Sequence, residues 1–224
     1  SLGINSMGSG TEESMSETIS PTNDSGPFYL RTYLRIATAP SADNRIIEFK
    51  NSSATVIAYM VLKSTGALGL YDEDGQVGSS SSALSTATWY RVEMLVDARG
   101  AGATDIVEAK IDGAAAFATS STRDLSTGVD KFLIGGNLNG EAQTQGDWNF
   151  DDIALNNGSG DTQTGYPGAG SIVHMQPDSD GDTVAWSNTF TSIDEVTPND
   201  GTDLIITSTA NAVEEANLES STAA

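Results

Sequence analysis

The stretch that decides the fold begins at 89–93 (WYRVE) and ends at 150–155 (FDDIAL). Between these segments lies 109–113 (AKIDG), in which apolar and polar residues alternate up to an Asp-Gly pair. Alternation with a period of two is typical of a half-buried β-strand, and Asp-Gly favours the tight turn of a hairpin. The stretch therefore predicts an all-β fold, and it indicates little about chemistry.

The same alternation recurs along the chain. From Phe28 to Ile36, mainly apolar residues alternate with tyrosines and arginines, which predicts one buried and one exposed face. Residues 56–62 (VIAYMVL) are apolar on both faces, as is typical of a central strand. Short strands at regular spacing predict a sandwich of two antiparallel sheets, and only 212–219 has a helical composition. Further strands are expected at 45–50, 67–71, 77–84, 105–112, 117–119 and 131–136.

The composition excludes several classes of partner. The chain has 31 acidic and 10 basic residues and a net charge of −21. Binding to nucleic-acid phosphates or to an anionic membrane surface needs clustered Lys and Arg, so neither partner is expected. The chain has no cysteine, which excludes disulfides and thiolate metal sites. It also lacks an apolar run of about 18 residues, so we expect no membrane-spanning segment.

Six segments carry a family resemblance. In order and spacing the chain is similar to laminin-G-like domains, which belong to the concanavalin A-like lectin/glucanase jelly rolls, over about residues 1–156. The resemblance implies a two-sheet antiparallel jelly-roll sandwich in which Trp89 begins a central strand and fills the core beside it. The segments are 28–35 (FYLRTYLR), 66–70 (GALGL), 89–93 (WYRVE), 111–113 (IDG), 133–135 (LIG) and 150–155 (FDDIAL).

The resemblance extends beyond the sandwich to 166–170 (YPGAG), 172–177 (IVHMQP) and 178–182 (DSDGD). With these segments the chain looks most like the laminin-G-like structural proteins of tailed bacteriophages. This implies a virion-surface role, as a capsid decoration or tail-associated subunit that contacts other virion proteins and forms a homo-oligomer. Because such proteins usually carry another strand before Ser1, we also expect a truncated or processed chain.

Carbohydrate binding is the main alternative, in a secreted or cell-surface adhesion module or on the virion itself. Sugar sites on such sandwiches combine exposed aromatic rings with Asn and Asp side chains. The candidate ligand residues are therefore Trp148, Tyr166, Asn137 and Asn139, with a host-surface glycan as the candidate ligand.

Enzymatic activity is not expected. Jelly-roll glucanases use two glutamates spaced Glu-x-Asp-x-Glu, and this spacing is absent. The single histidine, His174, has no Gly-x-Ser-x-Gly elbow to accompany it. We expect no cofactor apart from a candidate calcium ion at Asp178, Asp180 and Asp182, whose carboxylates alternate around a glycine; an acidic turn explains the same pattern.

The chain divides by composition into three parts. Residues 1–156 are expected to form the sandwich, 157–170 a Gly-rich linker, and 171–224 a short β-rich extension with strands at 171–175, 183–186 and 204–208. The extension is too short to close a core alone, so we expect it to pack on the sandwich or on a neighbouring subunit.

Overall fold

The computed structural model describes residues 2–5, 13–19, 26–99, 104–126, 128–138, 146–158, 164–170, 177–184 and 214–218. The chain divides into two compact units, Ser1–Gly170 and Ser171–Ala224. Among the described residues, none belongs to a helix that is long and apolar enough to cross a membrane.

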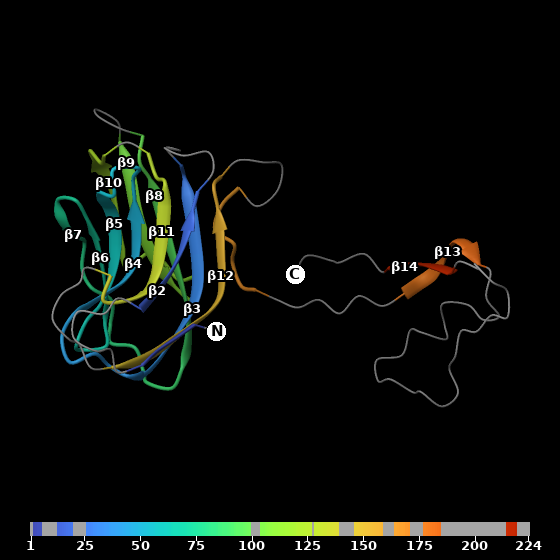
Figure 1. Ribbon diagram of the computed structural model, residues 1–224, viewed down its shortest axis with the longest axis horizontal. Coiled ribbons are helices and arrows are strands. Elements are labelled where there is room, and N and C mark those ends of the chain that lie inside the picture. The colour runs from blue at the N-terminus through green and yellow to red at the C-terminus, as the bar shows by residue number, and fades with distance from the viewer. Residues whose placement is uncertain are drawn as a thin grey trace. The chain divides into compact units, whose positions relative to one another are not determined.

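The first unit is an antiparallel jelly-roll sandwich of two six-stranded sheets (Figure 1). Sheet 1 has the order β1 (Leu2–Asn5), β12 (Asp147–Asn156), β3 (Phe28–Thr38), β8 (Trp89–Asp97), β9 (Asp105–Ile111), β10 (Ala118–Arg123). Sheet 2 has the order β2 (Glu13–Thr18), β11 (Lys131–Gly136), β4 (Asn44–Lys50), β5 (Val56–Leu62), β6 (Leu68–Asp72), β7 (Gly75–Val77). The predicted fold class is therefore confirmed.

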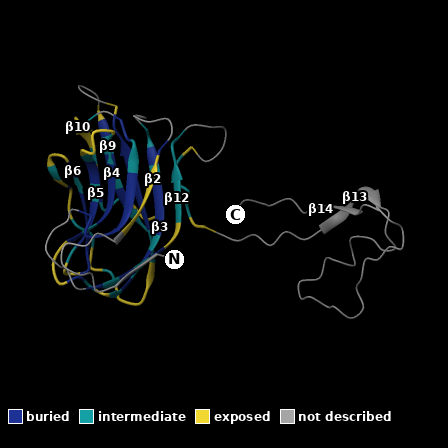
Figure 2. Ribbon diagram, viewed as in Figure 1, coloured by how far each residue is buried: buried dark blue, intermediate teal, exposed yellow. Residues whose placement is uncertain are grey.

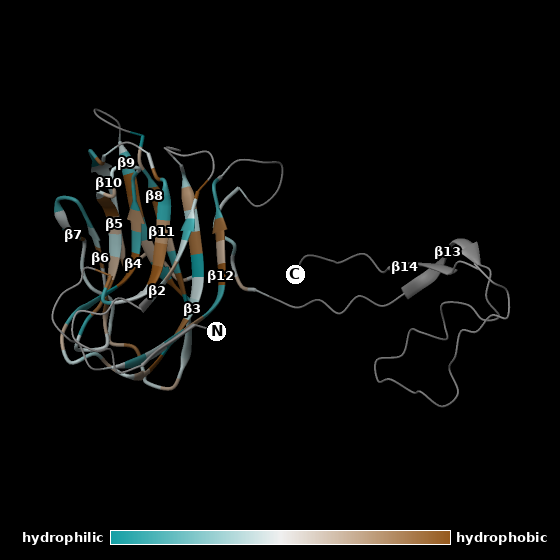
Figure 3. Cartoon of the chain, in the orientation of Figure 1, coloured by the Kyte–Doolittle hydropathy of each residue, from teal (hydrophilic) through white to brown (hydrophobic). Residues whose placement is uncertain are grey.

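The core forms because alternate residues of each strand face the opposite sheet. In β3, Phe28, Leu30 and Leu34 are fully buried, as their period of two predicts. Figure 2 shows the dark blue interior that these strands share, and Figure 3 shows that hydrophobic residues concentrate in the strands. The core draws on strands of both sheets, and its largest side chains are Trp148, Phe28, Phe49 and Phe150.

The expected strand at 77–84 is wrong for most of its length. Strand β7 ends at Val77, and the serine-rich residues after it form a loop that runs beside β6. Ser81 holds this loop in place, because its N–H donates to Leu68 O and its Oγ accepts from Leu68 N–H. Side-chain hydroxyls that bond the backbone compete with a regular strand ladder, which explains the difference.

The second unit contains one described strand pair, β13 (Pro177–Val184) and β14 (Glu214–Leu218), which are antiparallel. The helix expected at 212–219 is therefore wrong. Short isolated helices are marginal in water, whereas a strand can satisfy its backbone against a partner. The strands expected at 171–175 and 204–208 lie outside the described residues.

Candidate functional site

Trp148 lies in the core and not on a surface loop, which corrects its assignment as a stacking residue for a sugar. It is the second residue of β12 and has no exposed surface. Its indole Nε1–H donates to Gly135 O at 3.2 Å, so even the polar group is satisfied inside the protein. A ring in this position stabilises the sandwich and is closed to a ligand.

Asn137 is also buried, with 1% exposure, which corrects its assignment to an exposed binding loop. The residue follows β11 with a φ of 53°, a left-handed conformation that Asn tolerates better than most residues. Its N–H donates to Asn44 Oδ1 at 2.8 Å. Asn137 therefore shapes a turn, and Asn139 lies outside the described residues.

Tyr166 packs against the outer face of sheet 1. Its ring meets Tyr29 edge to face at 5.0 Å, and Lys110 Nζ lies 4.1 Å from the ring centroid. The phenol donates a hydrogen bond of 2.9 Å to Glu108 Oε1. Burial, reinforced by the charge of Glu108, raises the pKa of Tyr166 far above its usual value, so the phenol remains a donor.

The segment 164–170 therefore belongs to the sandwich, although its composition suggested a linker. Besides Tyr166, two backbone carbonyls fix it. Arg31 Nη1 donates to Gly168 O at 3.2 Å, and Asn156 Nδ2 donates to Gly165 O at 3.0 Å. This segment covers one half of the outer face of sheet 1, which we call the covered half and define by Tyr29, Arg31, Glu108, Lys110 and Asn156.

The other half of the face holds Trp89, which is 43% exposed. The expectation that Trp89 fills the core is wrong. Successive side chains of a strand point to opposite faces, and Val92 is buried in the core. Trp89, three residues earlier, therefore points outward from β8. In the register of the sheet, Arg35 lies directly opposite Trp89, and Asn149 lies opposite Arg35. Three neighbouring strands thus bring these side chains into one row.

The next row along the same face contains Asp151, Tyr33 and Arg91. Two of these residues have partners within the protein. Arg91 Nε lies 3.3 Å from Glu93 Oε2, and Asp151 Oδ1 accepts from the N–H of Asp152 at 2.9 Å. The remaining four outward residues of the two rows, Trp89, Arg35, Tyr33 and Asn149, are called the Trp89 patch below.

The side chains of the Trp89 patch make no hydrogen bond, ion pair or ring contact with any part of the chain that the structure describes. The patch offers the indole ring and its N–H, the five donors of one guanidinium, one phenol and one amide. All four side chains stand on strands, so their spacing is set by the sheet. Such an arrangement can stack an apolar ring face and hydrogen-bond the groups at its edge.

The outer face of sheet 2 carries similar residue types in a different state. Tyr59 and Tyr71 stack with centroids 5.1 Å apart, and the Arg45 guanidinium lies 3.8 Å over the Tyr59 ring. Arg45 and Lys50 both pair with the fully buried Glu48. These five residues therefore bind one another.

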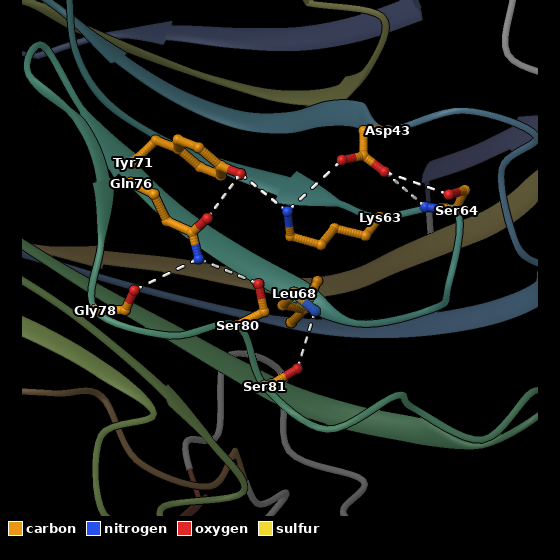
Figure 4. Close-up of polar contacts among 9 residues, drawn as sticks. All are labelled: Asp43, Lys63, Ser64, Leu68, Tyr71, Gln76, Gly78, Ser80 and Ser81. Atoms are coloured by element: carbon orange, nitrogen blue, oxygen red, sulfur yellow. Dashed lines mark hydrogen bonds and ion pairs between the residues drawn. The ribbon is translucent and has the colours of Figure 1, made fainter.

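Figure 4 shows the end of this network around Lys63. Lys63 Nζ donates to Tyr71 Oη at 2.9 Å and lies 3.6 Å from Asp43 Oδ2. The hydrogen bond with Tyr71 raises the pKa of Lys63 above 10.5. Tyr71 in turn donates to Gln76 Oε1 at 3.3 Å, and Gln76 Nε2 lies 3.3 Å from Ser80 Oγ.

The candidate calcium ligands Asp178, Asp180 and Asp182 lie in β13, where the structure describes the backbone and not the side chains. In the ranges that the structure does describe, no cluster of three or more His, Asp or Glu side chains could hold a metal ion. The calcium site therefore stays a prediction.

No protein-family model matches the chain, and no curated protein does. Solved structures that are similar include an alginate lyase of polysaccharide lyase family 7 (TM-score 0.44, 12% identity, 64% of this chain and 62% of that chain). Others are a Trypanosoma rangeli sialidase in complex with sialic acid (0.45, 15%, 59% and 21%) and a tetrameric galectin from the ball sponge Cinachyrella sp. (0.43, 14%, 64% and 99%). The chain thus spans less than two thirds of the alginate lyase and about a fifth of the sialidase. At these scores the similarities carry no argument about function.

Proposed function

We propose that this chain is a non-enzymatic carbohydrate-recognition protein whose binding site is the Trp89 patch. The observation that supports this proposal is an exposed indole on a rigid strand, surrounded by polar side chains without partners in the described protein. A pyranose presents an apolar face of C–H groups and a rim of hydroxyls. Trp89 would stack on the former, and Arg35, Tyr33 and Asn149 would bond the latter.

The patch is suited to binding because the backbone that carries it is already ordered before a ligand arrives. Arg35, Tyr33 and Asn149 lie on β3 and β12, which pair with each other, and β3 also pairs with β8, which carries Trp89. Interactions from a preorganised sheet cost less conformational entropy than interactions from a loop. Shallow sites of this kind favour moderate affinity and recognition of a sugar unit within a longer chain.

The neighbouring carboxylates support the non-enzymatic part of the proposal. Glycoside hydrolysis uses two carboxyl groups that flank the scissile bond, one as acid and the other as base or nucleophile. Beside the patch, Asp151 accepts a backbone N–H, Asp152 pairs with Arg31 at 2.6 Å, and Glu93 is 2% exposed. These three groups are engaged in holding the sheet, which leaves Asp147 on β12 as the carboxyl near the patch that makes no hydrogen bond or ion pair with the described residues. One carboxyl alone does not supply both roles.

The test is binding of the purified chain to an array of neutral and acidic oligosaccharides, compared with Trp89→Ala. We expect the wild-type chain to bind a subset of the array and Trp89→Ala to lose at least about tenfold in affinity, because aromatic anchors dominate small binding sites. Tyr71→Ala is the matched control, since it removes a ring from sheet 2 and should retain binding. Equal binding by Trp89→Ala would contradict the proposal.

A second proposal concerns the place where the protein works. The order and spacing of its six laminin-G-like segments favour a structural subunit on the surface of a virion, with other virion proteins and copies of itself as neighbours. Fractions of the source material from a density gradient can be searched for its peptides by mass spectrometry. Many copies in dense, nucleic-acid-containing particles would support a virion subunit, and peptides found only in soluble or cell-envelope fractions would favour a secreted or cell-surface module.

A further inference from the structure

Arg35 differs from almost every other basic residue of the chain. The chain has ten Lys and Arg residues, all of them described, and eight have a carboxylate within ion-pair distance. Only Arg35 and Lys131 have none in the described part of the chain. The eight paired residues are Arg31, Arg45, Lys50, Lys63, Arg91, Arg99, Lys110 and Arg123.

The lack of a carboxylate partner for Arg35 among the described residues is unexpected in a chain with about three acidic residues for each basic one. Two carboxylates near Arg35 on β12 are committed elsewhere, and a third, Asp147, makes no ion pair with Arg35 although it lies only two residues before Asn149. Asp151, which lies opposite Tyr33, accepts the N–H of Asp152, and Asp152 binds Arg31 at 2.6 Å. The local structure therefore leaves the guanidinium of Arg35 available beside the exposed indole of Trp89.

We propose that the ligand of the Trp89 patch is a carboxylated saccharide, such as a uronic or sialic acid, and that Arg35 binds its carboxylate. This inference rests on the proposed carbohydrate-binding function and adds the class of sugar. The planar fork of a guanidinium matches the two oxygens of a carboxylate in a bidentate pair. With the N–H of Trp89 and the amide of Asn149 the patch is rich in donors, which suits a ligand whose edge is rich in acceptors.

The negative net charge of the protein disfavours acidic ligands, so a preference for an acidic sugar over its neutral ester would point to a local contact. A net charge of −21 repels anions in general, so an acidic sugar gains nothing from the protein as a whole. At physiological ionic strength this repulsion is screened beyond roughly 8 Å. A preference for the acid form therefore has to come from a short-range contact such as the one with Arg35.

The test compares each acid with its own neutral ester. Oligogalacturonate, oligomannuronate and sialyllactose are titrated against the chain together with their methyl esters and with neutral galacto- and manno-oligosaccharides. We expect at least one acid to bind about ten- to a hundredfold more tightly than its ester, the range of a hydrogen-bonded charge. Arg35→Gln should reduce the affinity for this acid about ten- to a hundredfold and the affinity for the ester, which loses hydrogen-bond donors to its hydroxyls, by much less, so that the preference for the acid disappears.

Lys131→Gln provides the matched control. It removes the other basic side chain without a carboxylate partner among the described residues, on β11 of sheet 2, and should leave binding unchanged. If acid and ester bind equally, or if Arg35→Gln retains the preference for the acid, the inference is wrong while carbohydrate binding stands. If no saccharide on the array binds, the proposed function itself fails. Thermal unfolding of both variants confirms that they are folded.

Discussion

The outer faces of the two sheets are built from the same kinds of residue and differ in what these residues contact. On sheet 2, Arg45 lies over Tyr59 and pairs with Glu48, and the Tyr71 hydroxyl is bonded to Lys63. On sheet 1, Arg35 and Tyr33 make no such contact with the described protein. Arginine and tyrosine on a sheet face are therefore not a sign of binding by themselves. What distinguishes the sheet 2 network from the Trp89 patch is whether the polar groups are already satisfied by other described residues.

The largest expected effect separates the two tryptophans of sheet 1. Trp148→Ala should destabilise the protein by about 3–5 kcal/mol, because it empties a fully buried site and strands Gly135 O. Trp89→Ala should destabilise the protein far less, by about 1 kcal/mol, since Trp89 is 43% exposed and its side chain makes no hydrogen bond in the described protein. Urea unfolding of both variants measures the difference. Similar losses for the two would mean that Trp89 has a structural role.

The next largest effect on stability concerns Arg45 on sheet 2, which has a buried partner, and Arg35 on sheet 1. Glu48→Gln leaves Arg45 and Lys50 without their shared buried carboxylate, and we expect a loss of about 2–4 kcal/mol. Arg35→Gln breaks no contact in the described structure and should lie within about 0.5 kcal/mol of the wild type. The same unfolding assay tests both. A strongly destabilised Arg35→Gln variant would show that Arg35 has a stabilising partner in the protein and would contradict its assignment to the Trp89 patch.

A smaller effect concerns the covered half of sheet 1. Tyr166→Phe removes the hydrogen bond to Glu108 and keeps the ring contacts, so we expect a loss of about 1 kcal/mol. Because the pKa of Tyr166 is raised by burial and by Glu108, its phenol should be the last to ionise in an alkaline absorbance titration. The variant should lack this late component. An unchanged titration curve would show that the segment 164–170 does not stay on the sheet.

The smallest effect is a pH dependence of the free energy of unfolding that arises from Lys63 on sheet 2. The hydrogen bond with Tyr71 raises the folded-state pKa of Lys63 above its usual 10.5. A raised pKa stabilises the folded protein below the unfolded value, and this contribution is lost as pH rises through the folded value. The stability difference between wild type and Lys63→Gln, at most about 0.5 kcal/mol, should therefore shrink above pH 10.5. A difference that stays constant across this range would show that Lys63 does not hold its proton through Tyr71.

Periodicity predicted most of the sandwich, because its strands bury one face and the pattern of each strand is local. The same periodicity distinguishes the buried Trp148 from the outward-facing Trp89. Trp148 has the same parity as the buried Phe150, and Trp89 the opposite parity from Val92. The strand that holds Trp148 begins at Asp147, before the segment 150–155 that the sequence indicated, and so a core residue was assigned to a loop.

Other features of the site depend on contacts that no local pattern encodes. Tyr166 is held by Glu108, which is 58 residues away, and Gly168 by Arg31, which is 137 residues away. The same holds for Arg35, since the described residues around it, which offer no carboxylate partner, come together only when β3, β8 and β12 are aligned. Glycine-rich composition alone therefore suggested a linker where the chain packs on a sheet.

The most direct test of the account observes the three tryptophans while a ligand binds. In a 15N-labelled chain, the indole N–H signals are assigned with Trp89→Ala and Trp148→Phe and followed during titration with the oligosaccharides of the array. We predict that a saccharide shifts the signal of Trp89 in a saturable manner and leaves that of Trp148 in place. A saccharide that binds without moving the Trp89 signal, or no shift with any saccharide, would contradict the assignment of the Trp89 patch as the binding site.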